Sequence, residues 1–391
     1  TALLRMAYER FKASDAFSLE KFAETHKSWL TDYTLFMALK HANELRSWQE
    51  WPKPLRAREP KAIEEAIEAH EDEIGFWTFV QYVFFDQWQQ LKVYANNNGI
   101  EMIGDIPIYV AEDSSDVWAN PELYLLDNEN RPEFVAGCPP DAFSATGQLW
   151  GNPIYNWSLM EQNGYKWWIE RIKASYELFD VVRIDHFRGF ESYWSIPGGA
   201  ETAVNGEWIK GPEMKLFNAI KESLGDLKVI AEDLGFLTQD VIDFKEASGY
   251  PGMKVLEFAF DSKEESDYLP HNYEENCFVY TGTHDNDTVM GWFKNSNQAD
   301  IDKAIEYLRL TEEEGYHWGF IRGAWSSVGV VAIAQMQDFL ALDDTARMNI
   351  PSTIGGNWEW RMKPNQLTND LSDKIKRLTK LYGRLCSNED I

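Results

Sequence analysis

Apolar segments of strand length alternate with amphipathic helical segments along most of this chain. The pattern predicts strands at 100–110, 179–186, 227–233, 253–260, 277–284 and 329–338. It predicts helices at 76–96, 164–178, 213–224, 238–247, 298–309 and 368–385. Such alternation is typical of a mostly parallel sheet. An eight-stranded α/β barrel would need two more strands than these, and in a barrel the loops that follow the strands form the active face.

The predicted strands are nearly continuous apolar runs, as at 181–184 and 229–231. Such runs are expected where both faces of a sheet are buried. Residues 1–75 differ, because they have helical spacing, an exposed character and several prolines. After the strand at 100–110 come about 60 residues rich in Trp, Pro, Gly and Asn, and loops of that length in compact domains are usually functional.

Composition narrows the class of protein. The chain has 37 Lys and Arg against 64 Asp and Glu, a net charge of −27, which repels phosphate backbones and anionic membrane surfaces. We therefore expect neither nucleic acid nor a membrane as a partner. The three cysteines are widely spaced and predict no disulfide framework or zinc site. With no signal peptide and no apolar run of about 20 residues, a soluble cytoplasmic protein is expected.

Carboxylates occur on four of the predicted strands, at or near their ends. Asp105 lies in the first strand, and Asp185, Glu232 and Asp285 come at the ends of three later ones. A single carboxylate after a strand is often a helix N-cap, a role that suits Asp233. Four on different strands of a barrel would converge on one mouth, and burying them together is costly unless a site uses them.

Converging carboxylates suit two chemistries, a Mg²⁺ or Mn²⁺ site and glycosyl transfer. Arg183 favours glycosyl transfer, because it lies two residues before Asp185 and strand alternation puts both side chains on one face. A cation there disfavours a metal ion and lowers the pKa of Asp185, which suits a nucleophile. Glu232 would need a raised pKa in order to donate a proton near neutral pH.

The irregular region supplies groups that suit sugar recognition. Between residues 139 and 153 lie turn formers, amides such as Gln148, and the indole of Trp150. Amides pair with hydroxyl groups and an indole offers a stacking face, although a hydrated surface loop is the alternative. His186 and His284 each adjoin a candidate carboxylate. Isolated histidines are more often structural, but these two could donate hydrogen bonds to sugar hydroxyls. Zinc is disfavoured because the sequence has no HExxH motif.

Several stretches then match one family in its own order: GDIPIYVAEDSSDVW (104–118), PPDAFSATGQLWGNPIY (139–155), FDVVRIDHFRGF (179–190), VIAEDLG (229–235), YTGTHDNDTVMGWF (280–293) and NWEWRM (357–362). Together they resemble the amylomaltase or 4-α-glucanotransferase family, glycoside hydrolase family 77, which is related to the α-amylases. The resemblance implies a (β/α)8 TIM-type barrel with inserted, largely helical subdomains. It implies a helical insert subdomain at 1–75 and a catalytic barrel at 76–391, with an active-site loop insertion at about 111–163.

The resemblance also implies a reaction. The enzyme would cleave an α-1,4-glucan or malto-oligosaccharide and transfer the segment to the 4-hydroxyl of another glucan or of glucose, with retention of configuration and without a cofactor or metal. Asp185 resembles the nucleophile, Glu232 the acid/base, and Asp285 the carboxylate that holds ring hydroxyls in the transition state. The residues that resemble substrate contacts are Arg183, His186, His284, Asp105, Gln148 and Trp150.

Two departures from the family pattern qualify this expectation. The chain begins at Thr1 in helix-like sequence, so we expect the family's first two barrel strands, and with them part of the barrel, to be missing from it. Ser352 stands where the resemblance leads us to expect Gly, and this exchange is expected to alter the loop beside the acceptor path.

Three other functions compete with this interpretation. A hydrolase of the same mechanism would use water as the acceptor, and the sequence does not separate it from a transferase. A non-catalytic glucan-binding protein would lack a catalytic carboxylate, whereas all three are present. A metal-dependent phosphosugar enzyme on a similar barrel would lose activity with a chelator.

Overall fold

The structure is a computed structural model that describes residues 2–12, 16–140, 144–235 and 237–385. The chain forms two compact units. The first unit comprises Thr1–Val229 with Leu237–Ser248, and the second comprises Ile230–Phe236 with Gly249–Ile391. Within the described ranges, no helix is both long and apolar enough to cross a membrane.

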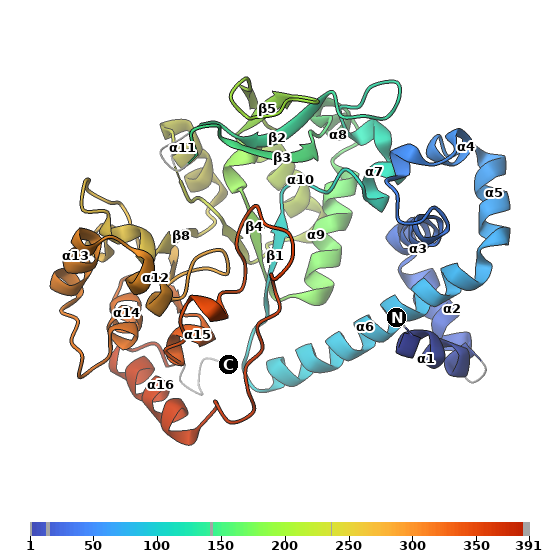
Figure 1. Cartoon of the computed structure of the whole chain (residues 1–391). Helices are drawn as coiled ribbons and strands as arrows, with labels where there is room; N and C mark the ends of the chain where they lie inside the picture. The colour runs from blue at the N-terminus through green and yellow to red at the C-terminus, as the bar shows by residue number, and fades with distance from the viewer. Residues whose placement is uncertain (1, 13–15, 141–143, 236, 386–391) are drawn as a thin grey trace. The chain divides into compact units, whose positions relative to one another are not determined.

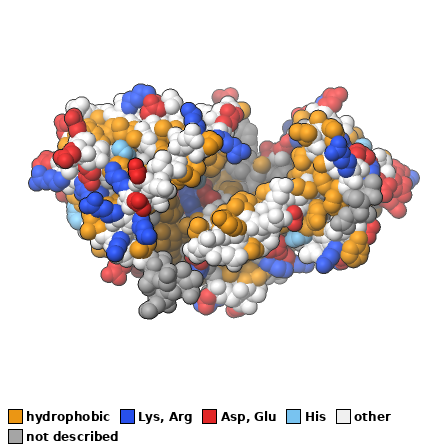
Figure 2. Space-filling model, turned by 90° about the horizontal axis from the view of Figure 1, so that it is seen from below, with side chains coloured by type: hydrophobic (Ala, Val, Ile, Leu, Met, Phe, Trp, Pro, Cys, Tyr) orange, Lys and Arg blue, Asp and Glu red, His pale blue; other side chains and the backbone are white. Residues whose placement is uncertain are grey.

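The first unit begins with a group of helices. They are α1 (Ala2–Lys12), α2 (Ala16–Thr25), α3 (Lys27–Ala42), α4 (Lys53–Arg56), α5 (Pro60–Ala69) and α6 (Glu71–Asn97). Figure 1 shows α6 as a long helix that leads from the shorter ones toward the first strand. The predicted helix at 76–96 is thus confirmed, with a start five residues earlier. Phe84, Leu91 and Tyr94 on α6 are exposed, and Figure 2 shows hydrophobic side chains on this part of the surface.

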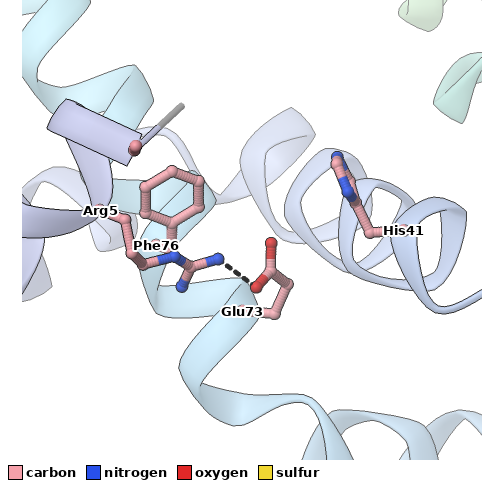
Figure 3. A pocket seen from close by; sticks show the side chains of 5 residues that line it. Arg5, His41, Glu73 and Phe76 are labelled. Carbon is pink, nitrogen blue, oxygen red and sulfur yellow. Dashed lines mark hydrogen bonds and ion pairs between the residues drawn. The ribbon is translucent and has the colours of Figure 1, made fainter.

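Aromatic packing holds α1 against α6. The rings of Tyr8, Phe76 and Phe79 form a buried cluster, and the guanidinium of Arg5 lies 3.7 Å from the centre of the Phe76 ring and pairs with Glu73. Beside this cluster is an open cavity of about 320 Å³ (Figure 3). Ala2 and His41 complete its lining, and no predicted site residue contributes to it.

A parallel sheet follows the helices. Strand β1 (Ile103–Pro107) pairs with β4 (Val181–Asp185), with Asp105 opposite Arg183. The crossover between the two strands ends in α9 (Lys166–Leu178). The sheet has the order β1-β4-β7, and the boundary between the two units falls within β7 (Val229–Ala231). Helix α10 (Met214–Leu224) precedes β7, and α11 (Gln239–Ser248) closes the first unit.

The region that we expected to be irregular contains regular structure, and this expectation was wrong. Two short helices, α7 (Ser115–Ala119) and α8 (Trp157–Gln162), lie in it. Its two strands, β2 (Phe134–Cys138) and β3 (Gln148–Pro153), belong to an antiparallel sheet of order β3-β2-β5-β6, part of which is visible in Figure 1. The other two strands of this sheet, β5 (Ser192–Pro197) and β6 (Glu207–Lys210), come later in the chain.

The irregular appearance of the sequence has a physical cause at Gly137. The register between β2 and β3 shifts next to this residue. A Cβ at position 137 would collide with the backbone oxygen of Gln148, so the close approach of the two strands requires glycine. A glycine within a short strand interrupts the alternation by which strands are recognised.

The second unit contains the other parallel strands, in the order β10-β9-β8. They are β8 (Gly252–Val255), β9 (Cys277–Tyr280) and β10 (Val331–Ile333), and the helices are α12 (Val289–Asn295), α13 (Gln298–Leu308), α14 (Tyr316–Trp325), α15 (Met336–Phe339) and α16 (Asn369–Leu381). Each predicted strand is present but shorter than expected. The residues that follow β8 form a 3-10 helix, Leu256–Phe260, from which Leu256, Ala259 and Phe260 enter the core. Helices α12, α14 and α15 were not predicted, and α15 begins within the predicted strand at 329–338.

One buried carboxyl stands out in the core of this unit. Glu257 Oε1 and Gln335 Oε1 are both buried and have no hydrogen-bond partner among the described residues. A Cβ at Gly282 would lie 2.7 Å from Glu257 Oε1 and 3.0 Å from Gln335 Nε2, so both side chains adjoin this glycine. Burial raises the pKa of Glu257 well above its ordinary value, and Asp338 and Asp287 raise it further, against the lowering effect of Arg347. A protonated Glu257 is a donor that would suit the Gln335 oxygen.

We predict that Glu257→Gln makes the protein less sensitive to rising pH. The folded pKa of Glu257 is raised, so the stability that its neutral form contributes is present below about pH 4.5 and is lost as pH rises toward the folded pKa. Between these two pH values, the free energy of unfolding of the wild type should fall by about 1.4 kcal/mol per pH unit relative to that of the variant. Denaturant unfolding at pH 5, 6 and 7 measures the difference, with exposed Glu264→Gln as the control. Parallel pH curves for wild type and Glu257→Gln would show that Glu257 is ionised in the folded protein.

Ser352 adopts a backbone conformation that favours glycine. Its φ is +63°, in the left-handed region that costs a residue with a Cβ about 1–2 kcal/mol. We predict that Ser352→Gly is more stable than Ser296→Gly by about 1–2 kcal/mol. The second variant is a matched control, because Ser296 has an ordinary φ of −76°. Both changes raise the conformational entropy of the unfolded chain by the same amount. Equal midpoints in urea would mean that Ser352 is unstrained.

Candidate active site

Three of the predicted site residues form one ionic cluster in the first unit. Arg183 Nη1 donates to both carboxylate oxygens of Asp105, each at 2.7 Å, and lies 2.9 Å from Asp185 Oδ1. The Arg183 side chain is 9% exposed, whereas those of Asp105 and Asp185 are 36% and 44% exposed. A buried cation is therefore shared by two carboxylates that reach the surface, and its N–H groups fix the directions of both carboxylates.

The backbone explains why these side chains meet. Arg183 and Asp185 are two residues apart on β4, and the prediction that they share a face is confirmed. Val182 and Ile184 point to the opposite face and are fully buried. The register with β1 then puts Asp105 directly opposite Arg183. Sequence reasoning identified all three charged residues but did not pair Asp105 with Arg183.

Trp150, His186 and Gln148 form a second group in the same unit. The rings of Trp150 and His186 meet edge to face, with centres 4.8 Å apart. Trp150 Nε1 donates to Gln148 Oε1 at 3.1 Å, and both residues come from β3. His186 directly follows β4 with a left-handed φ of +53°. Burial, together with the charge of Arg188, lowers the pKa of His186 to about 3, so its imidazole is neutral at physiological pH.

Glu232 lies in the second unit, directly after β7. Its side chain is buried, and its Oε1 accepts a hydrogen bond from the backbone N–H of Leu234 at 2.8 Å. The next residue, Asp233, accepts from the N–H of Met253 at 2.7 Å and packs against Gly252. The expectation that Asp233 caps a helix was therefore wrong. Its carboxylate instead fastens the end of β7 to the start of β8.

Asp285 and His284 follow β9 in the second unit, and a later loop holds them. Asn349 Nδ2 donates to Asp285 Oδ1 at 2.6 Å, while Arg347 Nη2 donates to the Asp285 backbone carbonyl at 2.6 Å. His284 Nε2 lies 3.4 Å from Asp285 Oδ2, and the His284 ring centre lies 5.0 Å from that of Trp358.

Sequence reasoning missed the supporting roles of Arg347, Asn349 and Trp358. A signal existed for two of them, because Trp358 falls in the matched stretch 357–362 and Asn349 lies three residues before the unusual Ser352. Nothing in the sequence pointed to Arg347. The structure thus brings together Asp105 with Arg183 and Asp185, Gln148 with Trp150 and His186, and His284 with Asp285.

Comparison with known proteins gives these groups a family context. The profile of glycoside hydrolase family 77, described as 4-alpha-glucanotransferase, matches residues 1–368. The chain is 56% identical to a 4-alpha-glucanotransferase of Clostridium butyricum, over 98% of this chain and 79% of that protein. It is 51% identical to one from Streptococcus pneumoniae serotype 4, over 99% of this chain and 77% of that protein.

A solved structure agrees with the sequence relatives. The amylomaltase from Streptococcus agalactiae, in complex with acarbose, superposes with a TM-score of 0.94 at 40% identity, covering 98% of this chain and 78% of that one. The mixed α/β fold of the chain is therefore that of an amylomaltase-like glycoside hydrolase. With a profile match over most of its length and relatives above 50% identity, the chain belongs to the 4-alpha-glucanotransferase family, glycoside hydrolase family 77.

Proposed function

We propose that this protein disproportionates α-1,4-glucans. It would cleave a glucan or malto-oligosaccharide and transfer the segment to the 4-hydroxyl of an acceptor glucan or of glucose. Membership of a family of glycosyltransferring enzymes supports the reaction class. The observation that carries the assignment of the site is the Asp105–Arg183–Asp185 cluster, because a carboxylate held beside a buried guanidinium suits attack on an anomeric carbon.

Asp185 is the proposed nucleophile and Glu232 the proposed acid/base. In the first step Asp185 bonds to the anomeric carbon while Glu232 gives a proton to the leaving glycosidic oxygen. In the second step Glu232 takes the proton of the acceptor 4-hydroxyl, which displaces Asp185. Two inversions at one carbon retain the α configuration. Burial of Glu232 supports this role, because it shields the proton transfer from bulk water.

The remaining predicted residues are proposed to hold the sugar. Asp285 would accept hydrogen bonds from ring hydroxyls that strengthen in the transition state, and the amide of Asn349 fixes its direction. Trp150 is partly exposed and would offer its indole to a sugar ring. The other proposed contacts are Asp105, Arg183, Gln148, His186 and His284.

We also propose that the two parallel sheets belong to a (β/α)8 barrel. The strand-and-helix order and the amylomaltase-like fold support this architecture. The helical insert subdomain at 1–75, the catalytic barrel at 76–391 and the active-site insertion at about 111–163 stay predictions, as does a cytoplasmic location.

Incubation with maltotriose tests the proposed function. We expect glucose together with maltopentaose and longer oligosaccharides, because cleavage of maltotriose releases glucose and a transferase passes the remaining maltosyl segment to another sugar. Chromatography of a time course measures these products. Glucose and maltose without longer products would assign the protein as a hydrolase, and unchanged maltotriose would leave only glucan binding.

The two catalytic roles respond differently to a donor that needs no protonation. With maltotriose, Glu232→Gln and Asp185→Asn should each lower kcat by about 1,000-fold or more. With α-maltosyl fluoride, the first step of Glu232→Gln should recover at least about 10-fold, because fluoride leaves without a proton, whereas Asp185→Asn should stay inactive. Fluoride release measures this step, and exposed Glu207→Gln is the control. Equal losses with both donors in Glu232→Gln would contradict its role as the acid.

A further inference from the structure

One fully buried carboxylate in the second unit binds both ends of the loop that carries His284 and Asp285. Asp338 on α15 has no exposed surface. Its Oδ2 accepts from the Thr281 hydroxyl at 2.6 Å, and its Oδ1 accepts from the backbone N–H of Val289 at 2.8 Å. Thr281 is the first residue after β9, and Val289 is the first residue of α12.

The attachment points are themselves fixed. The Thr281 N–H donates to the carbonyl of Ile333 on β10, and its own carbonyl accepts from the Glu257 N–H. Val289 is fully buried in the core cluster that includes Leu256. The Asp338 carboxylate therefore links the end of β9 to the start of α12. This one side chain fixes the distance that the backbone of the loop spans between them.

A second contact to the same loop comes from the segment before Asp338. Gln335 Nε2 donates to the backbone carbonyl of Asp287 at 2.9 Å. Asp287 is two residues beyond Asp285, and Asp338 is three beyond Gln335, so one short segment holds the loop at three points. Because α15 follows β10 and β10 pairs with β9, this segment is anchored to the strand from which the loop emerges.

We propose that Asp338 is a positioning residue for Asp285. It does not touch the sugar in this proposal. It fixes the span of the 281–289 loop, so that the Asp285 carboxylate already points where it must in the transition state. The inference rests on the proposed role of Asp285. It adds that a buried residue on another element, Asp338 on α15, fixes the direction of the Asp285 carboxylate.

Preorganisation gives this arrangement a kinetic signature. A carboxylate that must be placed accurately only in the transition state affects kcat more than ground-state binding. Loosening the loop should therefore lower kcat while KM stays nearly constant. A change that merely reduced the amount of folded protein would also lower the apparent kcat at constant KM, but only in proportion to the folded fraction, which unfolding measurements give independently.

Thr281→Val tests the proposal with a minimal change. Valine has the shape of threonine but lacks the hydroxyl that donates to Asp338. In the intact enzyme with maltotriose, we expect kcat to fall about 10-fold, KM to stay within about twofold, and Thr281→Ser to recover most of the wild-type rate. Asp338→Asn removes the carboxylate itself and should show the same split.

Thr379→Val is the matched control. It makes the same chemical change in the same unit. Thr379 lies on α16, away from the 281–289 loop, and its hydroxyl accepts a hydrogen bond from the Trp325 indole N–H, which the valine cannot accept. It should destabilise the protein similarly and leave kcat unchanged. Hydrogen exchange of the 281–289 backbone should be faster in Thr281→Val than in Thr379→Val.

Two outcomes would overturn the inference: a wild-type kcat with unchanged loop exchange in Thr281→Val, or an equal loss of kcat in Thr379→Val. The proposed function fails separately, if the wild-type enzyme forms no longer oligosaccharides from maltotriose. In that case the exchange comparison alone decides whether Asp338 fixes the loop.

Discussion

The buried guanidinium of Arg183 is the interaction on which the candidate site of the first unit depends. A cation with only 9% of its side chain exposed is costly unless anions compensate it. Asp185 comes from the same strand and Asp105 from the strand beside it, so the compensation exists only in one register of β1 against β4. A slip of one residue would turn Asp105 away and leave the charge of Arg183 poorly balanced. The charges and the strand register therefore specify each other.

This dependence also marks how far the site could be predicted from sequence. Alternation within β4 is local, so the shared face of Arg183 and Asp185 could be predicted from spacing alone. The partnership with Asp105 joins residues 78 positions apart and follows from the crossover that ends in α9. Likewise, Arg347 and Asn349 reach Asp285 from more than 60 residues away. Contacts of this kind are set by topology, which no local pattern encodes.

The fold shows the same division between local and non-local signals. Parallel strands were predictable because burial on both faces produces continuous apolar runs. The ends of these strands were not predictable, since Leu256, Ala259 and Phe260 enter the core from a 3-10 helix rather than from a strand. The antiparallel sheet was missed because Gly137 and the shifted register next to it break the alternation of β2. Asp233 was misread for a related reason, since its partner Met253 lies on another strand.

The two units hold their candidate carboxylates by different physical means, and the proposed roles give a reason. A nucleophile must be ionised before it attacks, so a guanidinium directly beside Asp185 serves it. A carboxylate that accepts from sugar hydroxyls needs direction more than charge. Asp285 receives a neutral amide on its side chain, while the cation of Arg347 binds its backbone carbonyl. An amide orients a carboxylate only if the backbone beneath it is fixed, and a loop lacks the register that fixes β4. A buried carboxylate that binds both ends of that loop supplies the missing constraint.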